Sequence, residues 1–440
     1  MVKKDLILKY ALQNAIFYSG KANPRAVLGK VLASEPELRR DIKGLEKEIE
    51  EIAGEINKLP LEEQRQKLED LAPRMMVKEV KVQKELPDLL GAKPGGVVTR
   101  FAPSPSGPLS LPHLLRAAFL SYLYARGYQG KFILRFEDTD PGKIRKEFFG
   151  YIRKDLKECG IEWDQEVMQS DYMEEYYTYA GQLIREGKAY TCSCTAKAFQ
   201  KLKRKKQNCP GRRMDSREHL KKWQDMLEGR YGEGTAVVRL RTSMKDKNPA
   251  MRDPPLLRIS EEEHPLKKRK YRVWPLYNFA CVIDDHVLGV THVFRGKEHE
   301  NNTHVQERLY KALGWKPPFV INFGMVQLPG EKLHTRDIKE MIREGRAEGW
   351  DDIRLPTIRA LLRRGFHPKA FRACAIGCGL TKTDIIFNWE SLEKENRRFQ
   401  DLNASRYMAV LDPVKVSVKG SHHELRKIFQ PLHPDLPRKG

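Results

Sequence analysis

The spacing of apolar positions changes once along the chain, near residue 96. Before it, apolar side chains recur at helical spacing, as in Leu8, Leu12, Ala15 and Ile16, and again in Ile42, Leu45, Ile49, Ile52 and Ile56. Such stripes are typical of helices with one buried face. Asn23-Pro24 predicts an N-cap followed by proline at the first helical position. Residues 1–76 are therefore predicted to form a helical domain, and 77–95, rich in Lys, Glu, Pro and Gly, a linker.

After residue 96, short β-rich runs alternate with helical stretches. The runs are Val97–Phe101, Lys131–Phe136, Val290–Phe294 and Phe319–Gly324, and a helix is predicted over Leu114–Arg126. This alternation predicts an α/β fold with a parallel sheet and crossover helices. The basic block 192–270, with a strand-like run at Ala236–Arg241, interrupts the pattern. We interpret it as an insertion between two halves of one nucleotide-binding fold, 96–191 and 271–345.

The remaining residues return to helical spacing and then lose it. Residues 346–403 are predicted to be helical, and 404–440 contain one β-like run, Tyr407–Val418, before a proline-rich end.

The net charge of the chain indicates which class of molecule it binds. The 440 residues carry 81 Lys and Arg against 59 Asp and Glu, a formal net charge of +22. A one-signed surplus of this size favours a polyanion such as nucleic acid, with a merely solvated surface as the alternative. We find no apolar run of membrane-spanning length and no signal peptide. Seven unevenly spaced cysteines fit a reducing compartment, so a cytoplasmic location is expected.

Charged residues follow three of the predicted strands. Arg100 stands in a run that ends in the turn Ala102–Gly107, and the second strand is followed by Glu137, Asp138 and Asp140. The carboxyl edge of a parallel sheet is where open α/β sheets bind ligands, and an arginine there suits a carboxylate. The acids could hold an ammonium group, a ribose or magnesium, and we expect Glu137 to face the ligand and Asp140 to cap a helix.

The third strand ends similarly, in Arg295-Gly296-Lys297-Glu298-His299. Before it, Tyr271–Ala280 and Ile283–His286 set polar groups among apolar ones. Such a segment could line a small-molecule pocket, and a helix buried on one side with an acidic end remains an equal alternative.

Five segments together resemble a known family. They are Arg100–Gly107, Arg135–Asp140, Trp274–Ala280, Arg295–His299 and Gly349–Ala360. In this order they are similar to glutamyl-tRNA synthetases of the archaeal type, which are class I aminoacyl-tRNA synthetases. The resemblance implies a Rossmann-type sheet with an inserted domain that binds the tRNA acceptor end, an N-terminal helical domain, and a C-terminal helical stem-contact region that ends in the start of an anticodon-binding β-barrel.

The resemblance also implies a two-step reaction. The glutamate α-carboxylate attacks the α-phosphorus of ATP with its Mg²⁺ ion, pyrophosphate leaves, and the glutamyl-adenylate acylates the terminal adenosine of tRNA. The implied glutamate-binding residues are Arg100, Ala102, Ser104, Glu137, Tyr277 and Arg295. The implied ATP-binding residues are Ser110, His113, Glu298, Lys332 and Arg336, of which His113, Lys332 and Arg336 are the implied catalytic residues. Arg295 favours glutamate over glutamine, because a neutral amide would leave a buried guanidinium unpaired.

Both ATP signatures of the family are altered here. In place of His-x-Gly-His stand Ser110, Leu111, Pro112 and His113, and the spacing to Arg116 is one residue longer than the family pattern. Proline removes a backbone donor and fixes φ. In the Lys-Met-Ser-Lys-Ser-type loop, Lys332–Lys339, His334 and Thr335 replace the serine and the second lysine. We expect a working ligase; a catalytically silent or altered-acceptor paralogue that binds tRNA or a synthetase partner remains the alternative.

The insertion and the C-terminus add further expectations. The cations Lys201, Lys203, Arg204, Lys205, Lys206, Arg212 and Arg213 are predicted to contact tRNA phosphates. Cys192, Cys194 and Cys209 resemble three zinc ligands, with His219 as a fourth candidate; because structural zinc needs four ligands, free thiols remain the alternative and no metal is assigned. The C-terminus is short for the family, which suggests a truncated barrel, an anticodon that is not read or a partner chain that supplies the missing barrels.

Overall fold

The computed structural model describes residues 2–18, 20–72, 75, 86–330, 335–404 and 411–415. The chain divides into two compact units, Met1–Gln83 and Lys84–Gly440, each of which is described by itself. Within the described part, no helix is long and apolar enough to cross a membrane. The finer domain boundaries proposed from the sequence remain predictions.

The first unit is helical, as predicted. Its elements are α1 (Val2–Phe17), α2 (Pro24–Ser34), the 3₁₀ turn η1 (Pro36–Asp41), α3 (Ile42–Ile56) and α4 (Leu61–Leu71). Asn23 caps α2, because its side chain accepts from the backbone N–H of Arg25 at 3.0 Å. Leu45 and Ile49 are fully buried, whereas Ile42 is 42 % exposed. The apolar stripe therefore holds except at its first position, where α3 begins.

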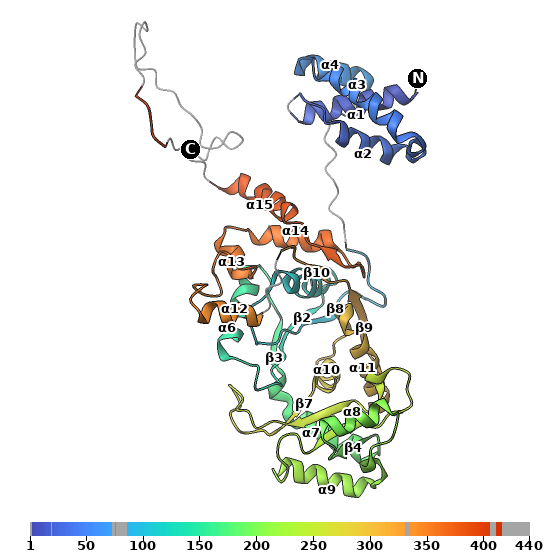
Figure 1. Ribbon diagram of the computed structural model, residues 1–440, viewed down its shortest axis with the longest axis vertical. Coiled ribbons are helices and arrows are strands. Elements are labelled where there is room, and N and C mark those ends of the chain that lie inside the picture. Colours follow the sequence, from blue (N-terminus) through green and yellow to red (C-terminus); the bar gives the residue numbers. More distant parts are fainter. Residues whose placement is uncertain are drawn as a thin grey trace. The chain divides into compact units, whose positions relative to one another are not determined.

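The second unit contains the predicted parallel sheet (Figure 1). Strands β1 (Val98–Phe101), β2 (Lys131–Phe136) and β3 (Gln165–Met168) pair in parallel, as do β8 (His292–Gly296) and β9 (Phe319–Phe323). Thr291, at the entrance to β8, bonds to Val98 of β1: its N–H donates to the Val98 carbonyl at 2.9 Å, and its hydroxyl oxygen accepts from the Val98 N–H at 2.8 Å. Strands β2 and β3 therefore extend from β1 on one side, and β8 and β9 lie on its other side. Such a switch in strand order is where open α/β sheets form a ligand crevice.

Helices connect these strands and form the core with them. They are α5 (Phe119–Gly127), α6 (Lys146–Glu158), the turn η4 (Gln169–Tyr172), α7 (Met173–Arg185), α10 (Tyr277–Val287), the turn η7 (Lys297–His299) and α11 (Glu300–Leu313). The predicted third strand lies two residues later than expected, because Val290 still closes the end of α10 by donating to the carbonyl of Asp285 at 2.8 Å.

A π-helical turn, η3 (His113–Ala118), precedes α5. Phe119 donates to the carbonyl of Leu114, five residues earlier. This wider turn holds one residue more than an α-helical turn, which fits the extra residue before Arg116. Arg116 is 2 % exposed and donates to the carbonyls of Cys378, Gly379 and Thr381 at 2.8–3.1 Å. Its guanidinium thereby satisfies carbonyls at the end of a C-terminal helix.

An antiparallel sheet of four strands spans residues 189–275, so it extends beyond both limits of the insertion predicted at 192–270. They are β4 (Ala189–Cys192), β5 (Val237–Leu240), β6 (Pro255–Ile259) and β7 (Val273–Pro275), paired in that order. Around them lie α8 (Ala196–Arg204), η5 (Pro210–Arg213), α9 (Ser216–Leu227) and η6 (Pro249–Met251).

The region after β9 is largely helical. It contains β10 (Val326–Gln327), paired in parallel with β11 (Ile385–Ile386), and the helices α12 (Thr335–Arg343), α13 (Ile358–Arg363), α14 (Pro368–Cys378) and α15 (Trp389–Asn403). Most of the predicted run Tyr407–Val418 lies outside the described residues, and residues 411–415 form no strand. The expected barrel stub is thus not shown.

Candidate active site

The loops that follow β1, β2 and β8 lie at one edge of the sheet because their strands are parallel. The Pro-rich turn after β1 is tied to the loop after β2, since the N–H of Glu137 donates to the carbonyl of Pro103 at 3.0 Å. The turn is also held from the C-terminal side, where Ser110 forms a β-bridge with Thr357. Contacts within the protein therefore hold the turn after β1 at this edge of the sheet.

A buried ion network lies at this edge. Oδ1 of Asp285, on α10, accepts from Nε of Arg100 at 3.1 Å and from Nη1 of Arg135 at 2.6 Å. Arg135 also lies 3.3 Å from the carboxylate of Glu137. Only Nε of Arg100 is engaged within the described part of the chain, so its two Nη groups remain for a ligand. A guanidinium held in this way presents a fork suited to a carboxylate.

Charge pairing sets the protonation of this network. Burial acts to raise the pKa of Asp285, but Arg100 and Arg135 outweigh it and hold that pKa below its usual value. Burial acts to lower the pKa of Arg135, yet Asp285 and its other neighbours raise it well above normal. The neighbouring Asp284 accepts from the hydroxyl of Tyr176 and the amide of Gln169, and burial raises its pKa to about 7.

Of the six residues predicted to bind the amino acid glutamate, the structure places four near one another: Arg100, Glu137, Tyr277 and Arg295. Burial raises the pKa of the Tyr277 phenol, which also feels the charges of Glu137, Arg100 and Arg295. These four come from α10 and from the ends of β2, β1 and β8. The remaining two, Ala102 and Ser104, lie in the turn after β1, half-buried and exposed respectively.

Arg295 differs from Arg100 in its partners. It is 5 % exposed, and it donates to the side-chain oxygens of Gln306 at 2.8 Å and Thr303 at 2.6 Å. Its Nε is buried without a hydrogen-bond partner in the described residues. No described carboxylate pairs with it, whereas Arg100 has Asp285.

Two residues of the altered first ATP signature contact each other. The Ser110 hydroxyl and Nδ1 of His113 lie 3.0 Å apart, in hydrogen-bond contact. Desolvation lowers the pKa of His113, and the charge of the nearby Glu298 carboxylate only partly opposes that shift, so three predicted ATP residues meet here. A Cβ on Gly296 would collide with the Glu298 carboxylate, which shows that this carboxylate folds back over the end of β8.

The second signature lies beside the Pro-rich turn. Lys332 and His334 lie outside the described residues. Arg336 is 90 % exposed and lies 3.7 Å from the carboxylate of Asp337. Lys339 donates to the carbonyl of Ser106 at 3.1 Å, which ties α12 to the turn.

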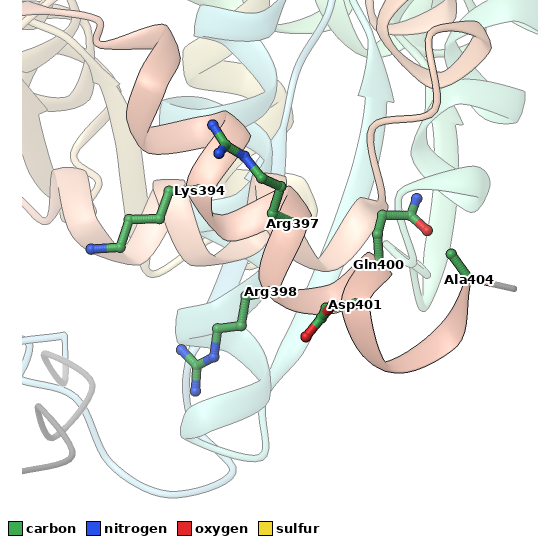
Figure 2. A pocket seen from close by; sticks show the side chains of 6 residues that line it. All are labelled: Lys394, Arg397, Arg398, Gln400, Asp401 and Ala404. Carbon is green, nitrogen blue, oxygen red and sulfur yellow. The ribbon is translucent and has the colours of Figure 1, made fainter. Parts of the chain in front are cut away.

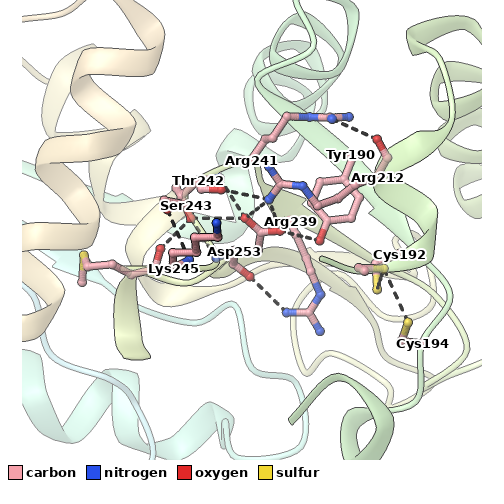
Figure 3. A network of polar contacts seen from close by, with 12 residues as sticks. Tyr190, Cys192, Cys194, Arg212, Arg239, Arg241, Thr242, Ser243, Lys245 and Asp253 are labelled. Atoms are coloured by element: carbon pink, nitrogen blue, oxygen red, sulfur yellow. Dashed lines mark hydrogen bonds and ion pairs between the residues drawn. The ribbon is translucent and has the colours of Figure 1, made fainter. Parts of the chain in front are cut away.

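The predicted tRNA-contacting cations lie on and after α8. Lys201, Arg204, Lys205, Lys206 and Arg213 are exposed, and Lys203 is half-buried. Arg212 is an exception, because it pairs with the fully buried Asp253 at 2.5 Å and donates to the carbonyl of Thr242 at 2.9 Å (Figure 3). Its charge is compensated within the fold, so it holds the insertion together.

The three cysteines of the insertion form a compact cluster. Sγ of Cys209 lies 3.4 Å from that of Cys192 and 3.5 Å from that of Cys194, and Figure 3 shows the latter two beside the arginine network. All three sulfurs lie within 4.8 Å of one another. His219 instead has its Nδ1 bound to Thr191, with the N–H of Thr191 donating at 3.2 Å. The predicted fourth ligand is thus not part of the described cluster.

A hollow on α15 offers no comparable chemistry. Figure 2 shows its lining residues Lys394, Arg397, Arg398, Gln400, Asp401 and Ala404. Arg397 and Arg398 lie 3.7 and 3.8 Å from glutamates of the same helix. The cations are therefore largely balanced on the helix itself.

Sequence reasoning missed the residues beneath the edge. Arg135, Asp284 and Asp285 were not predicted as site residues, although two adjacent acids on an apolar helix were a usable signal. The expected role of Asp140 as a helix cap is wrong, since α6 begins at Lys146 and Asp140 accepts from Arg258 at 2.7 Å.

Comparison with known proteins identifies the family. Residues 96–402 match the model of the catalytic domain of class I tRNA synthetases for E and Q, that is, glutamate and glutamine. The chain belongs to this family. It is 46 % identical over 447 residues to a glutamate–tRNA ligase of Pyrococcus furiosus, with 100 % of this chain and 78 % of the relative covered. A glutamate–tRNA ligase of Methanothermobacter thermautotrophicus is 44 % identical, with 99 % and 78 % covered.

Solved synthetase structures share the fold. A glutamate–tRNA ligase from Elizabethkingia meningosepticum, crystallised with its amino acid, superposes with a TM-score of 0.51 at 22 % identity, covering 70 % of each chain. The comparisons give no support to the partner chain that the short C-terminus suggested.

Proposed function

We propose that this synthetase ligates glutamate to the 3′ end of tRNA through a glutamyl-adenylate. The identity to glutamate–tRNA ligases over the whole chain supports the activity. The observation that carries the substrate is the group formed by Arg100, Glu137, Tyr277 and Arg295 at one sheet edge. It presents two cations for the two carboxylates of glutamate and one acid for its ammonium group.

The chain contributes positioning and charge stabilisation to both steps. Arg100 and Arg295 hold the amino acid so that its α-carboxylate oxygen can attack the α-phosphorus of ATP while the bond to pyrophosphate breaks. Ser110, His113, Glu298 and Arg336 are the described residues that we assign to ATP with its Mg²⁺ ion, and Lys332 is assigned with them. Held donors of this kind lower the barrier without covalent chemistry of their own.

The exposed cations on and after α8 supply a surface for the acceptor end of tRNA. Lys201, Arg204, Lys205, Lys206 and Arg213 form it, with the half-buried Lys203 beside them. Phosphate binding by such a surface weakens steeply with salt. The three-cysteine cluster beneath it offers three thiolates for zinc, which would stabilise the insertion rather than take part in ligation.

The test is glutamate-dependent exchange of pyrophosphate into ATP, with and without total tRNA. We expect exchange, stimulated by tRNA, followed by glutamyl-tRNA formation. The absence of exchange in both conditions, together with salt-sensitive tRNA binding, would contradict the ligase and support the silent paralogue.

Replacing Pro112 with glycine is expected to raise the exchange rate by about tenfold. Glycine restores a backbone N–H at the position where the family signature places one, and a preorganised donor to developing phosphate charge is worth roughly 10²–10³. Pyrophosphate exchange at saturating glutamate measures the change. Pro108→Gly, in the same loop, is the control, and an equal rate in Pro112→Gly and the parent would refute our placement of the signature.

Replacing Cys209 with serine is expected to remove about one bound zinc ion per chain and to lower the melting temperature. Cys209 lies between the two other thiols, so its loss leaves two of the three described ligands. A structural zinc site takes four ligands, so the parent site needs one more from outside the described cluster and the variant would need two. Metal analysis and thermal melting of purified full chain check this. Cys378→Ser, a half-buried thiol outside the cluster, is the matched control. A parent protein free of metal would contradict the zinc assignment.

A further inference from the structure

Arg295 is a buried cation whose partners are all neutral in the described structure. Its two Nη groups donate to Gln306 and Thr303, and it has no described carboxylate within ion-pair distance. Asp285 compensates both Arg100 and Arg135 at the same sheet edge. A buried charge without a counter-ion is costly, and the cost is recovered when an anion binds it.

Gln306 begins a series of side-chain hydrogen bonds in which each donor and acceptor can be assigned. Arginine only donates, so Oε1 of Gln306 faces Arg295, and Nε2 of Gln306 then donates to Asn278 at 3.1 Å. Asn278 in turn donates to Asn302 at 3.1 Å, and Asn302 to Nδ1 of His299 at 3.0 Å. His299 accepts at Nδ1 and is therefore neutral, and burial lowers its pKa.

This series of hydrogen bonds ends at a residue that lies beside the pocket. The ring of His299 lies 5.5 Å from that of Tyr277, which feels the charge of Arg295. The amide chain thus orients both Arg295 and the neighbouring aromatic wall without adding a negative charge.

We infer that Gln306 is a specificity-determining positioning residue: its neutral amide holds Arg295 while leaving the guanidinium charge free to select the side-chain carboxylate of glutamate over the amide of glutamine. The inference rests on the proposed function only in that the pocket takes glutamate. Arg295 touches the ligand, and Gln306 acts through Arg295.

Gln306→Glu is the decisive variant because glutamate has the same shape and adds the missing counter-charge. We expect its dissociation constant for glutamate to rise by about 10- to 100-fold, since a hydrogen bond to a charged group is worth about 1.5–3 kcal/mol. A glutamate side chain cannot donate to the Asn278 oxygen as Gln306 does, so the dissociation constant for glutamine should rise only as far as it does in Gln306→Met. The preference for glutamate then falls, because the added negative charge weakens glutamate binding beyond that common loss.

Gln306→Met separates charge from positioning. Methionine is neutral but breaks the amide chain, so it should weaken both ligands by similar factors and keep the preference for glutamate. Asn301→Asp is the matched control, because it adds the same charge to α11 at an exposed site and still accepts from Asn248, as Asn301 does at 2.8 Å.

Calorimetric titration of the full chain with glutamate and with glutamine measures these effects without ATP or tRNA. An unchanged preference in Gln306→Glu, or an equal loss of preference in Gln306→Met, would overturn the inference, as would a parent protein that binds neither ligand. If Gln306→Glu does not fold, preserved preference in Gln306→Met supports the inference and lost preference overturns it. Failure of the proposed function is distinct, because it appears as glutamate binding without pyrophosphate exchange.

Discussion

Replacing Asp285 with alanine is expected to destabilise the second unit by about 3–5 kcal/mol, the cost typical of removing one partner from a buried ion pair. The variant leaves Arg100 and Arg135 buried, at 5 % and 0 % exposure, without the oxygen that they share. Asp285→Asn keeps the shape and one acceptor, so it should lose less. All six tryptophans lie after residue 83, so tryptophan fluorescence during urea unfolding reports on this unit alone.

Glu228→Gln is the control for the Asp285 variants. Glu228 pairs with Arg230 at 2.6 Å, but the two side chains are 41 % and 62 % exposed, and exposed pairs contribute about 1 kcal/mol or less. Because the arginines hold the pKa of Asp285 below its usual value, the stabilisation is present above the unfolded value near pH 4 and is lost as pH falls below it. Equal unfolding midpoints for Asp285→Ala and Glu228→Gln would contradict the buried-network interpretation.

The parallel strands β1, β2, β8 and β9 could be predicted because they contain short apolar runs, whereas β3 (Gln165–Met168), which begins with two polar residues, was not predicted. Lys131–Phe136 was located to the residue, since the strand is buried after Lys131 and the charged residues Lys131 and Glu137 mark its two limits. The β8 boundary was not, because Val290 and Thr291 are as β-prone as the strand that they precede. Local pattern does not tell which backbone groups a preceding helix still uses.

Roles that depend on distant partners could not be predicted. Asp285 reaches Arg135 across 150 positions of the sequence, and an acidic pair on an apolar helix is compatible with either a capped end or a buried network. Arg212 likewise counted as one more cation in a basic run until its contact with Asp253 placed it inside the fold. Residue type gives the charge, but tertiary contacts decide whether that charge is available to a ligand.

The π-helical turn is a second feature that the sequence could not predict. An extra residue before Arg116 was visible as a spacing anomaly, but its structural consequence was not. The turn η3 absorbs the residue, so that Arg116 still reaches the carbonyls at the end of α14. The extra residue therefore lies in a wider helical turn next to His113, and Arg116 beyond it contacts the end of α14.

Replacing Arg295 with glutamine is expected to raise the Michaelis constant for glutamate by about 10²-fold or more and to remove the preference for glutamate over glutamine. Its buried guanidinium has no described counter-ion, so we expect the ligand carboxylate to supply the compensating charge in the parent enzyme. Sites built to pair with one polar group discriminate strongly against an analogue that lacks it, because a buried group is then left unpaired. Pyrophosphate exchange with each amino acid as the varied substrate measures both constants.

Arg308→Gln provides the control because it removes the same charge from α11 at an exposed position. Arg308 pairs with Asp246 across the surface and is 42 % exposed, so its loss should leave both Michaelis constants within about twofold. Two variants remove the unpaired charge in different ways: Arg295→Gln deletes the guanidinium, and Gln306→Glu places a carboxylate beside it. Both should lower the preference for glutamate over glutamine. Arg295→Gln should have the larger effect, because it also removes the hydrogen-bond donors of the guanidinium. A glutamate preference that survives in Arg295→Gln would move the selection of the side-chain carboxylate to another residue of the pocket. Arg100 is then the candidate, because among the described residues only its Nε is engaged.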